Sequence, residues 1–460
     1  MFIFLQFTQK ILIRKLPRCE KNIKYYSFVG KCFLMRDNNS NSIDSADYDK
    51  YRKKVFDFLW YEVEPLAGEI DKTGDFPQEI MFPKFRKHGL WGLLIPEEYG
   101  GLGLSVQQYL PFLAEFSKVA GVVRVLLHVH NTSARAIACY GNDSQKAALL
   151  PKLAKGDSSV TFAITEPNAG SGMDIACTAV QNGSDWVING TKHYITNAEF
   201  ADLHLVCCRT THEDSRHAHT AIIVPTGVTG LNIEKMPDLM GNNGPYHGIL
   251  RFENVRVPID SIIGNEGDGL NVFLGELEPS RVFVGASSLG AAERALEIAL
   301  DFSKKRVTFN KVISSRPSVQ AELAEMARDI YGLKLILEDV ANKIDNKIEC
   351  SLEASIAKLS GLEIVMRVTD KALDVVGGRS YFSDYPYPLE RIYRESRINL
   401  LEEGTPSIQR LVIARSLIDL PVPLKIGTLG TPYQPSGCSP ALGKNLPHDL
   451  SYSHAKNKTK

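Results

Sequence analysis

The chain has 460 residues, with 53 Lys and Arg against 53 Asp and Glu, and 44% of its residues are hydrophobic. Domains usually take about 100–200 residues, so this length predicts two to four folded units with sizeable cores. The balanced charge argues against nucleic acid as a partner, because binding to phosphates needs an excess of basic residues. The cysteines are too sparse for a disulfide scaffold and form no CxxC pair, which argues against structural zinc. No apolar run reaches the roughly 18 residues that a membrane span needs.

The two ends of the chain differ in composition from the middle. Residues 1–36 carry eight basic residues and one acidic residue, with apolar residues between the charges. This pattern is typical of a mitochondrial transit peptide and predicts a protein of the mitochondrial matrix. The alternative is an upstream extension with Met35 as the true start, in which case we expect a cytoplasmic protein. Residues 421–460 hold six Pro, four Gly and one acidic residue, which predicts a disordered tail.

Residues 44–159 have the spacing of helices. Phe56, Leu59 and Trp60 recur at helical intervals, and the Gly-rich segment PEEYGGLGLS at 96–105 separates two helical stretches. The segment at 141–156 begins with capping residues and ends on Gly, as a short helix does. We therefore predict an N-terminal all-α domain.

Residues 160–269 change to short β runs separated by turn residues. Asn189-Gly190 stands between two such runs and predicts a hairpin, because its tight turn needs positive φ angles. Several short strands with frequent turns predict a small β-barrel or a sandwich.

Residues 270–420 return to a helical pattern with longer segments. Apolar residues from Leu323 to Ile344 step by three and four, which places them on one face of a long helix. Long helices of this kind predict a C-terminal helical bundle with subunit contacts. The chain has neither a βαβ alternation nor a GxGxxG motif that opens a helix, so we do not expect a Rossmann domain.

Six segments carry a family resemblance. They are PEEYGGLGL at 96–104, FAITEPNAGS at 162–171, KHYITN at 192–197, FENVRVP at 252–258, RVTFNK at 306–311 and NLLEEGTPSIQRLVIAR at 399–415. In this order and spacing they resemble the acyl-CoA dehydrogenase family from about residue 45 to 418. The resemblance implies an N-terminal α-helical domain, a middle β-barrel and a C-terminal four-helix bundle, assembled as a homotetramer. It also implies FAD as cofactor, an acyl-CoA substrate and an electron-transfer flavoprotein as partner.

The resemblance also implies which residues hold FAD. A flavin needs hydrogen-bond donors at its ring edge, a flat wall and partners for its pyrophosphate. By this resemblance, six residues should contact the flavin ring, form the flat wall beside it or lie on the loop of the base: Phe162, Thr165, Ser171, Tyr194, Thr196 and Thr405. Arg306 and Phe309 match a segment that reaches the pyrophosphate and adenine of a neighbouring subunit's FAD. Gly377 and Gly378 match a turn close to the adenine.

The base that removes the substrate's α-proton should be a poorly solvated carboxylate. The family places one Glu directly before Gly-Thr, which is Glu403 here, with Glu402 as the alternative. Some branches place the base one residue before the Arg that matches Arg281; that residue is Ser280 here, and Glu278 is out of register. Arg281 and Ser171 match positions that touch the CoA arm.

Some positions depart from the family pattern. Gly172 replaces an Asp, and Pro317 and Asp374 replace Gln residues that face FAD in relatives. These losses leave open that the protein is a non-catalytic scaffold that binds acyl-CoA or a partner. A separate alternative is an oxidase that passes its electrons to oxygen. His128 and His130 alternate as in a strand or loop and lack a third ligand, so we predict no metal site and no role for them.

Overall fold

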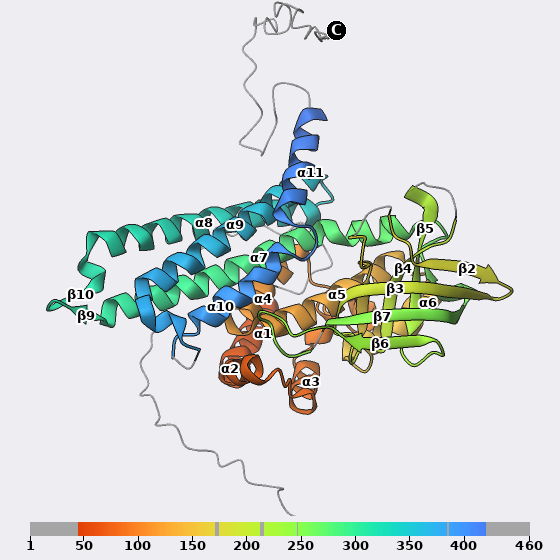
Figure 1. Cartoon of the computed structure of the whole chain (residues 1–460), viewed down its shortest axis with the longest axis horizontal. Helices are drawn as coiled ribbons and strands as arrows, with labels where there is room; N and C mark the ends of the chain where they lie inside the picture. The colour runs from red at the N-terminus through yellow and green to blue at the C-terminus, as the bar shows by residue number, and fades with distance from the viewer. Residues whose placement is uncertain (1–44, 171–173, 212–215, 246, 384–385, 420–460) are drawn as a thin grey trace, which may run out of the picture. The chain divides into compact units, whose positions relative to one another are not determined.

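The computed structural model describes residues 45–170, 174–211, 216–245, 247–383 and 386–419 (Figure 1). The predicted leader at 1–36, the predicted tail at 421–460, and Ser171 with Gly172 lie outside the described residues. In the described part, no helix combines the length and the hydropathy that a membrane span requires.

The N-terminal part is helical, as predicted. Its helices are α1 (Ser45–Phe58), α2 (Glu64–Thr73), α3 (Gln78–Lys87), α4 (Val106–Val119), α5 (Gly121–Tyr140) and α6 (Asp143–Lys155), with a π-helical turn at Leu59–Val63. Helices α4 and α6 each begin with a capping box, Ser105 with Gln108 and Asn142 with Gln145. These caps satisfy the free N–H groups of the first helical turn.

A sheet follows in the middle of the chain. Its strands are β1 (Val160–Ala163), β2 (Thr178–Asn182), β3 (Asp185–Thr196), β4 (Leu203–Arg209), β5 (His219–Pro225), β6 (Leu231–Lys235), β7 (His247–Pro258) and β8 (Ile262–Ile263). They pair in the order β6-β7-β3-β2-β4-β5-β8, with β1 beside β4. No pair among the described strands joins the two ends, so the sheet stays open where we predicted a barrel.

Packing explains why closure is unnecessary. Leu205 and Cys207 of β4 point to a core shared with α5, α6 and α7, whereas Val206 and Cys208 point to a second core within the curved sheet. Both faces of the central strand are therefore covered. The helices therefore cover one face of the sheet, while the sheet curves so that its own strands enclose the other face without closing.

The predicted hairpin at Asn189-Gly190 is wrong. Both residues lie inside the continuous strand β3, and the hairpin turn comes earlier, between Asn182 and Asp185. The register shifts between Ile188 and Gly190, which marks a bulge. A Cβ at Gly190 would come within 2.7 Å of Cys177 Cα, so this Gly serves a close approach of two strands.

Long helices make up the C-terminal part, as predicted. They are α7 (Gly269–Lys305), α8 (Pro317–Asp345), α9 (Ser351–Val376), α10 (Leu389–Ser396) and α11 (Pro406–Asp419), with a small hairpin of β9 (Val307–Thr308) and β10 (Lys311–Val312). On α8 the predicted apolar face is buried, including Met326, Leu333 and Leu337. Where α7 crosses α9, a Cβ at Gly361 would lie 3.0 Å from Gly285 Cα, so the crossing depends on two small residues.

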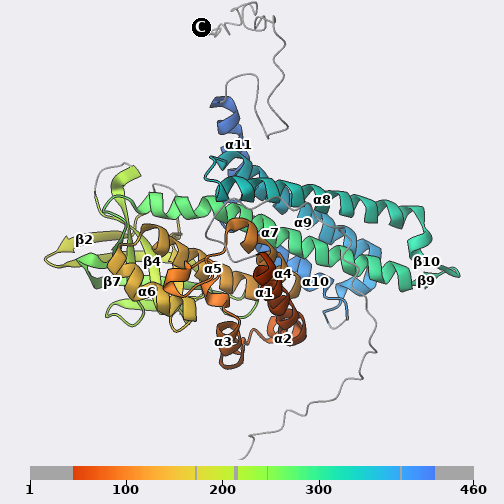
Figure 2. The same ribbon diagram turned by 180° about the vertical axis from the view of Figure 1, so that it is seen from behind.

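Helix α5 connects these parts. It contacts β1 and β3 of the sheet on one side and α4, α7 and α10 on the other, as Figures 1 and 2 show. Nearly all of its residues from Gly121 to Ile137 are buried. Polar groups on α5 are therefore placed between the sheet and the bundle.

Candidate active site

The loop from Leu401 to Thr405, which precedes α11, carries the predicted base. Glu403 has φ 53° and Gly404 has φ 93°. The left-handed conformation costs a non-Gly residue of order 1–3 kcal/mol, so surrounding contacts must hold it. Lys358 of α9 supplies them, because its Nζ donates to the carbonyl oxygens of Glu402 (2.5 Å) and Gly404 (2.9 Å). Burial lowers the pKa of Lys358 to about 8, and the negative charges of Glu403 and Glu402 oppose that shift.

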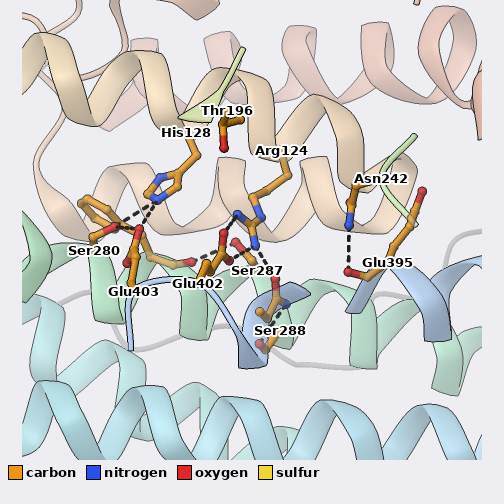
Figure 3. Close-up of polar contacts among 12 residues, drawn as sticks. Arg124, His128, Thr196, Asn242, Ser280, Ser287, Ser288, Glu395, Glu402 and Glu403 are labelled. Carbon is orange, nitrogen blue, oxygen red and sulfur yellow. Dashed lines mark hydrogen bonds and ion pairs between the residues drawn. The ribbon is translucent and has the colours of Figure 1, made fainter. Parts of the chain in front are cut away.

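The two carboxylate oxygens of Glu403 have different surroundings (Figure 3). Oε1 accepts a hydrogen bond from Ser280 Oγ at 2.6 Å and lies 3.2 Å from His128 Nε2. Oε2 is buried and has no hydrogen-bond partner among the described residues. Oε2 is therefore the oxygen that is free to act on a substrate.

The electrostatics of Glu403 combine opposing effects. Burial by itself would raise its pKa, but the hydrogen bond and charge of His128, the charge of Lys358 and the Ser280 hydroxyl lower the pKa to about 2. The side chain is 17% exposed. Glu403 is thus ionised at neutral pH, as a group that accepts a proton must be.

The two base positions of the sequence alternatives meet in space. Ser280 on α7 and Glu403 before α11 are 123 residues apart and share a hydrogen bond. A carboxylate at either position would therefore reach the same site.

Glu402 points to a different partner. It forms an ion pair with the buried guanidinium of Arg124, whose Nη1 donates to Glu402 Oε2 at 3.0 Å. Arg124 also donates to Asn399 Oδ1. Adjacent side chains diverge, so the charge of Glu402 is neutralised in the interior while Glu403 faces the site. This geometry favours Glu403 over Glu402 as the base.

The expectation for the two histidines is wrong in part. Both lie on helix α5 and not on a strand or loop. His130 is packed in the interior, where its Nε2 lies 3.2 Å from the carbonyl oxygen of Leu153. His128, which we predicted to have no role, contacts Glu403 directly.

The two predicted flavin segments are held together by a buried ion pair. Lys192 Nζ lies 2.8 Å from Glu166 Oε1 and also donates to the carbonyl oxygen of Ile164. The carboxylate of Glu166 accepts from the backbone N–H of Cys177 as well. Next to this pair, His193 N donates to the carbonyl oxygen of Thr165 at 2.8 Å. The interior contacts therefore fix Thr165 beside the strand that carries Tyr194.

That strand presents an aromatic ring and a hydroxyl near α5. Tyr194 has φ 60° at a register shift of β3 and is 61% exposed. Thr196 Oγ1 lies 3.1 Å from His247 Nε2. Asn197 Nδ2 donates to the carbonyl oxygen of Leu126, which ties this strand to α5. Figure 3 shows the neighbouring Thr196 beside Arg124 and His128 of that helix. The flavin segment and the base loop thus meet at the same helix.

Phe162 and Arg281 lie toward the same end of α7. The half-buried ring of Phe162 packs on Phe273, with ring centroids 4.5 Å apart. Arg281 follows Ser280 and donates to Ser355 Oγ at 3.3 Å, while its buried Nε has no partner among the described residues. Burial lowers the pKa of Arg281, and Glu278 and Glu403 oppose that shift. Thr405 is exposed at the start of α11.

The other predicted FAD residues lie at the opposite end of α7. Arg306, Thr308 and Gly378 line a cavity of about 410 Å³. Phe309 is 91% exposed, and a Cβ at Gly377 or Gly378 would meet no atom within 4 Å. From Phe273 to Arg306 the helix runs for 33 residues, or about 50 Å at 1.5 Å per residue. The predicted FAD residues of one chain therefore form two separate groups.

Comparison with known proteins agrees with this arrangement. Three family models match in order: the N-terminal, middle and C-terminal domains of acyl-CoA dehydrogenase, at residues 45–157, 161–255 and 267–418. The chain belongs to the acyl-CoA dehydrogenase family.

Individual relatives match over most of their length. An acyl-CoA dehydrogenase of Bacillus subtilis is 34% identical, over 80% of this chain and 97% of the relative. The human mitochondrial short-chain specific acyl-CoA dehydrogenase is 34% identical, over 79% of this chain and 88% of the relative. A chain solved in a study of the electron transferring flavoprotein of Acidaminococcus fermentans is 31% identical with a TM-score of 0.78, covering 84% of this chain and all of that one.

Acyl-CoA dehydrogenases are FAD-dependent flavoproteins, and the described residues fit this cofactor. The exposed Tyr194 ring offers a flat wall, and the Thr165 and Thr196 segments run beside it. At the other end, the cavity beside Arg306 has a guanidinium for phosphate and open space over the two glycines. The two residues that replace Gln in this chain lie where the structure tolerates them. Asp374 is exposed on α9, and Pro317 is the first residue of α8, where a missing N–H costs nothing.

Several residues of this acyl-CoA dehydrogenase site escaped the sequence analysis. They are Arg124, His128, Lys358 and Gln409, whose Nε2 donates to the carbonyl oxygen of Gly404 at 3.2 Å. A usable signal was present for two of them. Lys358 stands on an apolar helix face near Ala354 and Ala357, and His128 interrupts an apolar helical run. A buried polar residue in such a run needs a partner.

Proposed function

We propose that the protein converts an acyl-CoA thioester to the trans-2-enoyl-CoA, with Glu403 as the base that removes the α-proton. The observation that carries this proposal is the buried, unpartnered Oε2 of an ionised carboxylate next to the flavin segments. FAD, when bound, supplies the acceptor for the hydride that leaves the β-carbon. The α-proton goes to Glu403 Oε2, and the electron pair of that C–H bond forms the new double bond between the α- and β-carbons. The β-hydrogen leaves with its own electron pair as hydride.

The chain's own residues contribute orientation and a dry environment. Lys358 holds the Glu403 backbone, and α5 closes the site on one side. Exclusion of water removes the solvent that would compete for the free lone pairs of Glu403 Oε2, while His128, Lys358 and Ser280 keep the carboxylate ionised. Arg281, with its free Nε, is placed to meet the CoA arm.

The oligomeric state, the partner and the location belong to the same proposal. One chain carries the flavin-ring residues and the adenine residues about 50 Å apart along α7, so one FAD would need residues of two chains. This supports the proposed homotetramer. Similarity to the chain from the Acidaminococcus fermentans study supports an electron-transfer flavoprotein as acceptor. The basic composition of residues 1–36 supports the mitochondrial matrix as location.

An anaerobic titration of the purified protein with a panel of acyl-CoAs tests the proposal. The panel should start with short straight and branched thioesters, because a short-chain specific relative is 34% identical. We expect the flavin absorbance near 450 nm, a general property of oxidised flavin, to bleach with at least one thioester. Adding an electron-transfer flavoprotein should restore turnover, whereas peroxide formed in air without it would indicate an oxidase. A protein that binds FAD and bleaches with no thioester would contradict the proposal.

A further inference from the structure

His128 takes part in a polar network that the proposed reaction does not by itself explain. Its Nε2 lies 3.0 Å from Ser280 Oγ and 3.2 Å from Glu403 Oε1, and its Nδ1 lies 3.4 Å from Thr132 Oγ1. The side chain is 2% exposed, so protein groups and not bulk water satisfy it.

Counting donors assigns the hydrogens of this network. Ser280 has one hydroxyl hydrogen, and Glu403 Oε1 accepts it. The oxygen of Ser280 is then an acceptor, as is Glu403 Oε1, so the nitrogen facing both must carry a hydrogen. His128 Nε2–H is therefore shared between Ser280 and Glu403. Thr132 Oγ1 can pair with Nδ1 as donor or as acceptor, so this contact leaves the hydrogen on Nε2 in place.

The same count shows that the two carboxylate oxygens of Glu403 receive different numbers of hydrogen bonds. Oε1 receives a full hydrogen bond from Ser280 and a shared one from His128. Oε2 receives none from the described residues. Two donors on one oxygen resist rotation of the carboxylate, which would otherwise exchange Oε1 and Oε2. Such fixed orientation matters because a displacement of about 1 Å at a reacting group can cost 100-fold in rate.

We propose that His128 and Ser280 are positioning residues of the base: they hold Glu403 Oε1 and so point Oε2 at the α-carbon of the thioester. This inference rests on the proposed function of Glu403 and adds how that carboxylate is oriented. Helix α5 supplies His128 and α7 supplies Ser280, so two helices converge on one carboxylate oxygen.

The test uses the complete, FAD-loaded protein and a thioester that cannot be oxidised. In an acyl-CoA analogue with sulfur in place of the β-carbon, no hydride can leave, and α-hydrogen exchange with D₂O reports the base alone. His128→Phe keeps a ring but removes the donor, and we expect the exchange rate to fall about 10- to 100-fold. The dissociation constant of the analogue should stay within about threefold, because His128 acts on Glu403 and not on binding.

Rescue and a matched control separate positioning from packing. His128→Gln places an amide N–H near the former Nε2, so it should recover most of the lost exchange rate. His130→Gln makes the same replacement two residues away on the same helix, at a site bonded to Leu153 and not to Glu403. We expect its exchange rate to equal that of the wild type, even if its melting temperature falls.

A second variant guards against failure to fold. Ser280→Ala removes one hydroxyl and should also slow exchange, and combined with His128→Phe it should cost less than the two single effects multiplied. Crystal structures of the variants should show a rotated Glu403 carboxylate.

Two outcomes would overturn the inference and leave the proposed function intact: His128→Phe or Ser280→Ala exchanging as fast as the wild type, or His128→Gln as slow as His128→Phe. A folded, yellow wild type that exchanges no α-hydrogen would instead overturn the proposed function.

Discussion

The two ends of α7 differ in how far their surrounding residues are buried and paired. At the end near the sheet, Glu403, Lys358, Arg124 and His128 satisfy one another through buried hydrogen bonds and ion pairs. At the other end, Phe309 and the two glycines lie in the open around a cavity. At the first end most polar groups find partners within one chain, and Glu403 Oε2 is left without one among the described residues, whereas the second end leaves its groups open to solvent.

The difference shows how one fold separates chemistry from cofactor retention. A base must be rigid and dry, so its loop is fixed by interior contacts from α5, α7 and α9. Residues for a dinucleotide's far half can stay exposed, because binding itself buries them. We therefore expect mutations at the first end to change the reaction and those at the second to change FAD affinity.

Glu403→Gln should produce the largest effect. The amide cannot take the α-proton, so the rate of flavin bleaching by acyl-CoA should fall about 1,000-fold or more, while the protein stays folded and yellow. Stopped-flow absorbance measures this rate. Glu402→Gln is the matched comparison, because Glu402 pairs with Arg124, and it should lose stability more than rate. Equal losses in the two variants would refute the assignment of the base.

Lys358→Met should weaken the first end as a structural unit. Two carbonyl oxygens lose their donor, and an unsatisfied buried acceptor costs about 1–3 kcal/mol. We expect about 2 kcal/mol less stability in urea unfolding and roughly 10- to 100-fold slower bleaching, because Glu403 leaves its strained conformation. Lys371→Met on the same helix removes ion pairs with Glu322 and Glu325 near the surface, and it should cost less than about 1 kcal/mol. Bleaching at the wild-type rate in Lys358→Met would show that the loop needs no such support.

Arg306→Ala should affect the second end alone. The loss of a charge-assisted hydrogen bond to phosphate should raise the FAD dissociation constant about 10- to 100-fold. With FAD in saturating excess, the bleaching rate should stay within about threefold of the wild type, which flavin fluorescence and stopped-flow measurements can separate. Arg328→Ala, at an exposed ion pair on α8, serves as the control. A large fall in rate at saturating FAD would mean that the two ends are not independent.

The smallest effect concerns pH. The pKa of Glu403 is lowered from 4.5 to about 2 in the folded protein, so its ionised form stabilises the fold above pH 4.5, and this contribution is lost as the pH falls toward 2. The difference in urea midpoint between the wild type and Glu403→Gln should therefore shrink as the pH falls from 6 to 3. A difference that grows toward low pH would reverse the predicted direction.

Much of the fold followed from local pattern. The helical, β and helical textures predicted the three parts in order, and the α8 face predicted its buried side. The hairpin at Asn189-Gly190 failed because the close packing of Gly190 on Cys177 outweighed the turn preference of the dipeptide. The barrel failed because the described strands enclose the inner core without the two ends of the sheet pairing, while helices cover the outer face.

The site divides in the same way. The sequence by itself singled out Glu403 and the flavin segments, because they stand in continuous motifs that resemble those of the acyl-CoA dehydrogenase family. It named Ser280 only as the alternative base position, where this chain has no carboxylate. Only the tertiary structure decided that Glu402 turns to Arg124, that Lys358 holds the loop and that His128 meets Glu403. Those contacts join residues from 44 to 278 positions apart, and no local periodicity records them. Their physical cause is burial, since each polar group removed from water must find its partner wherever the folded chain brings one.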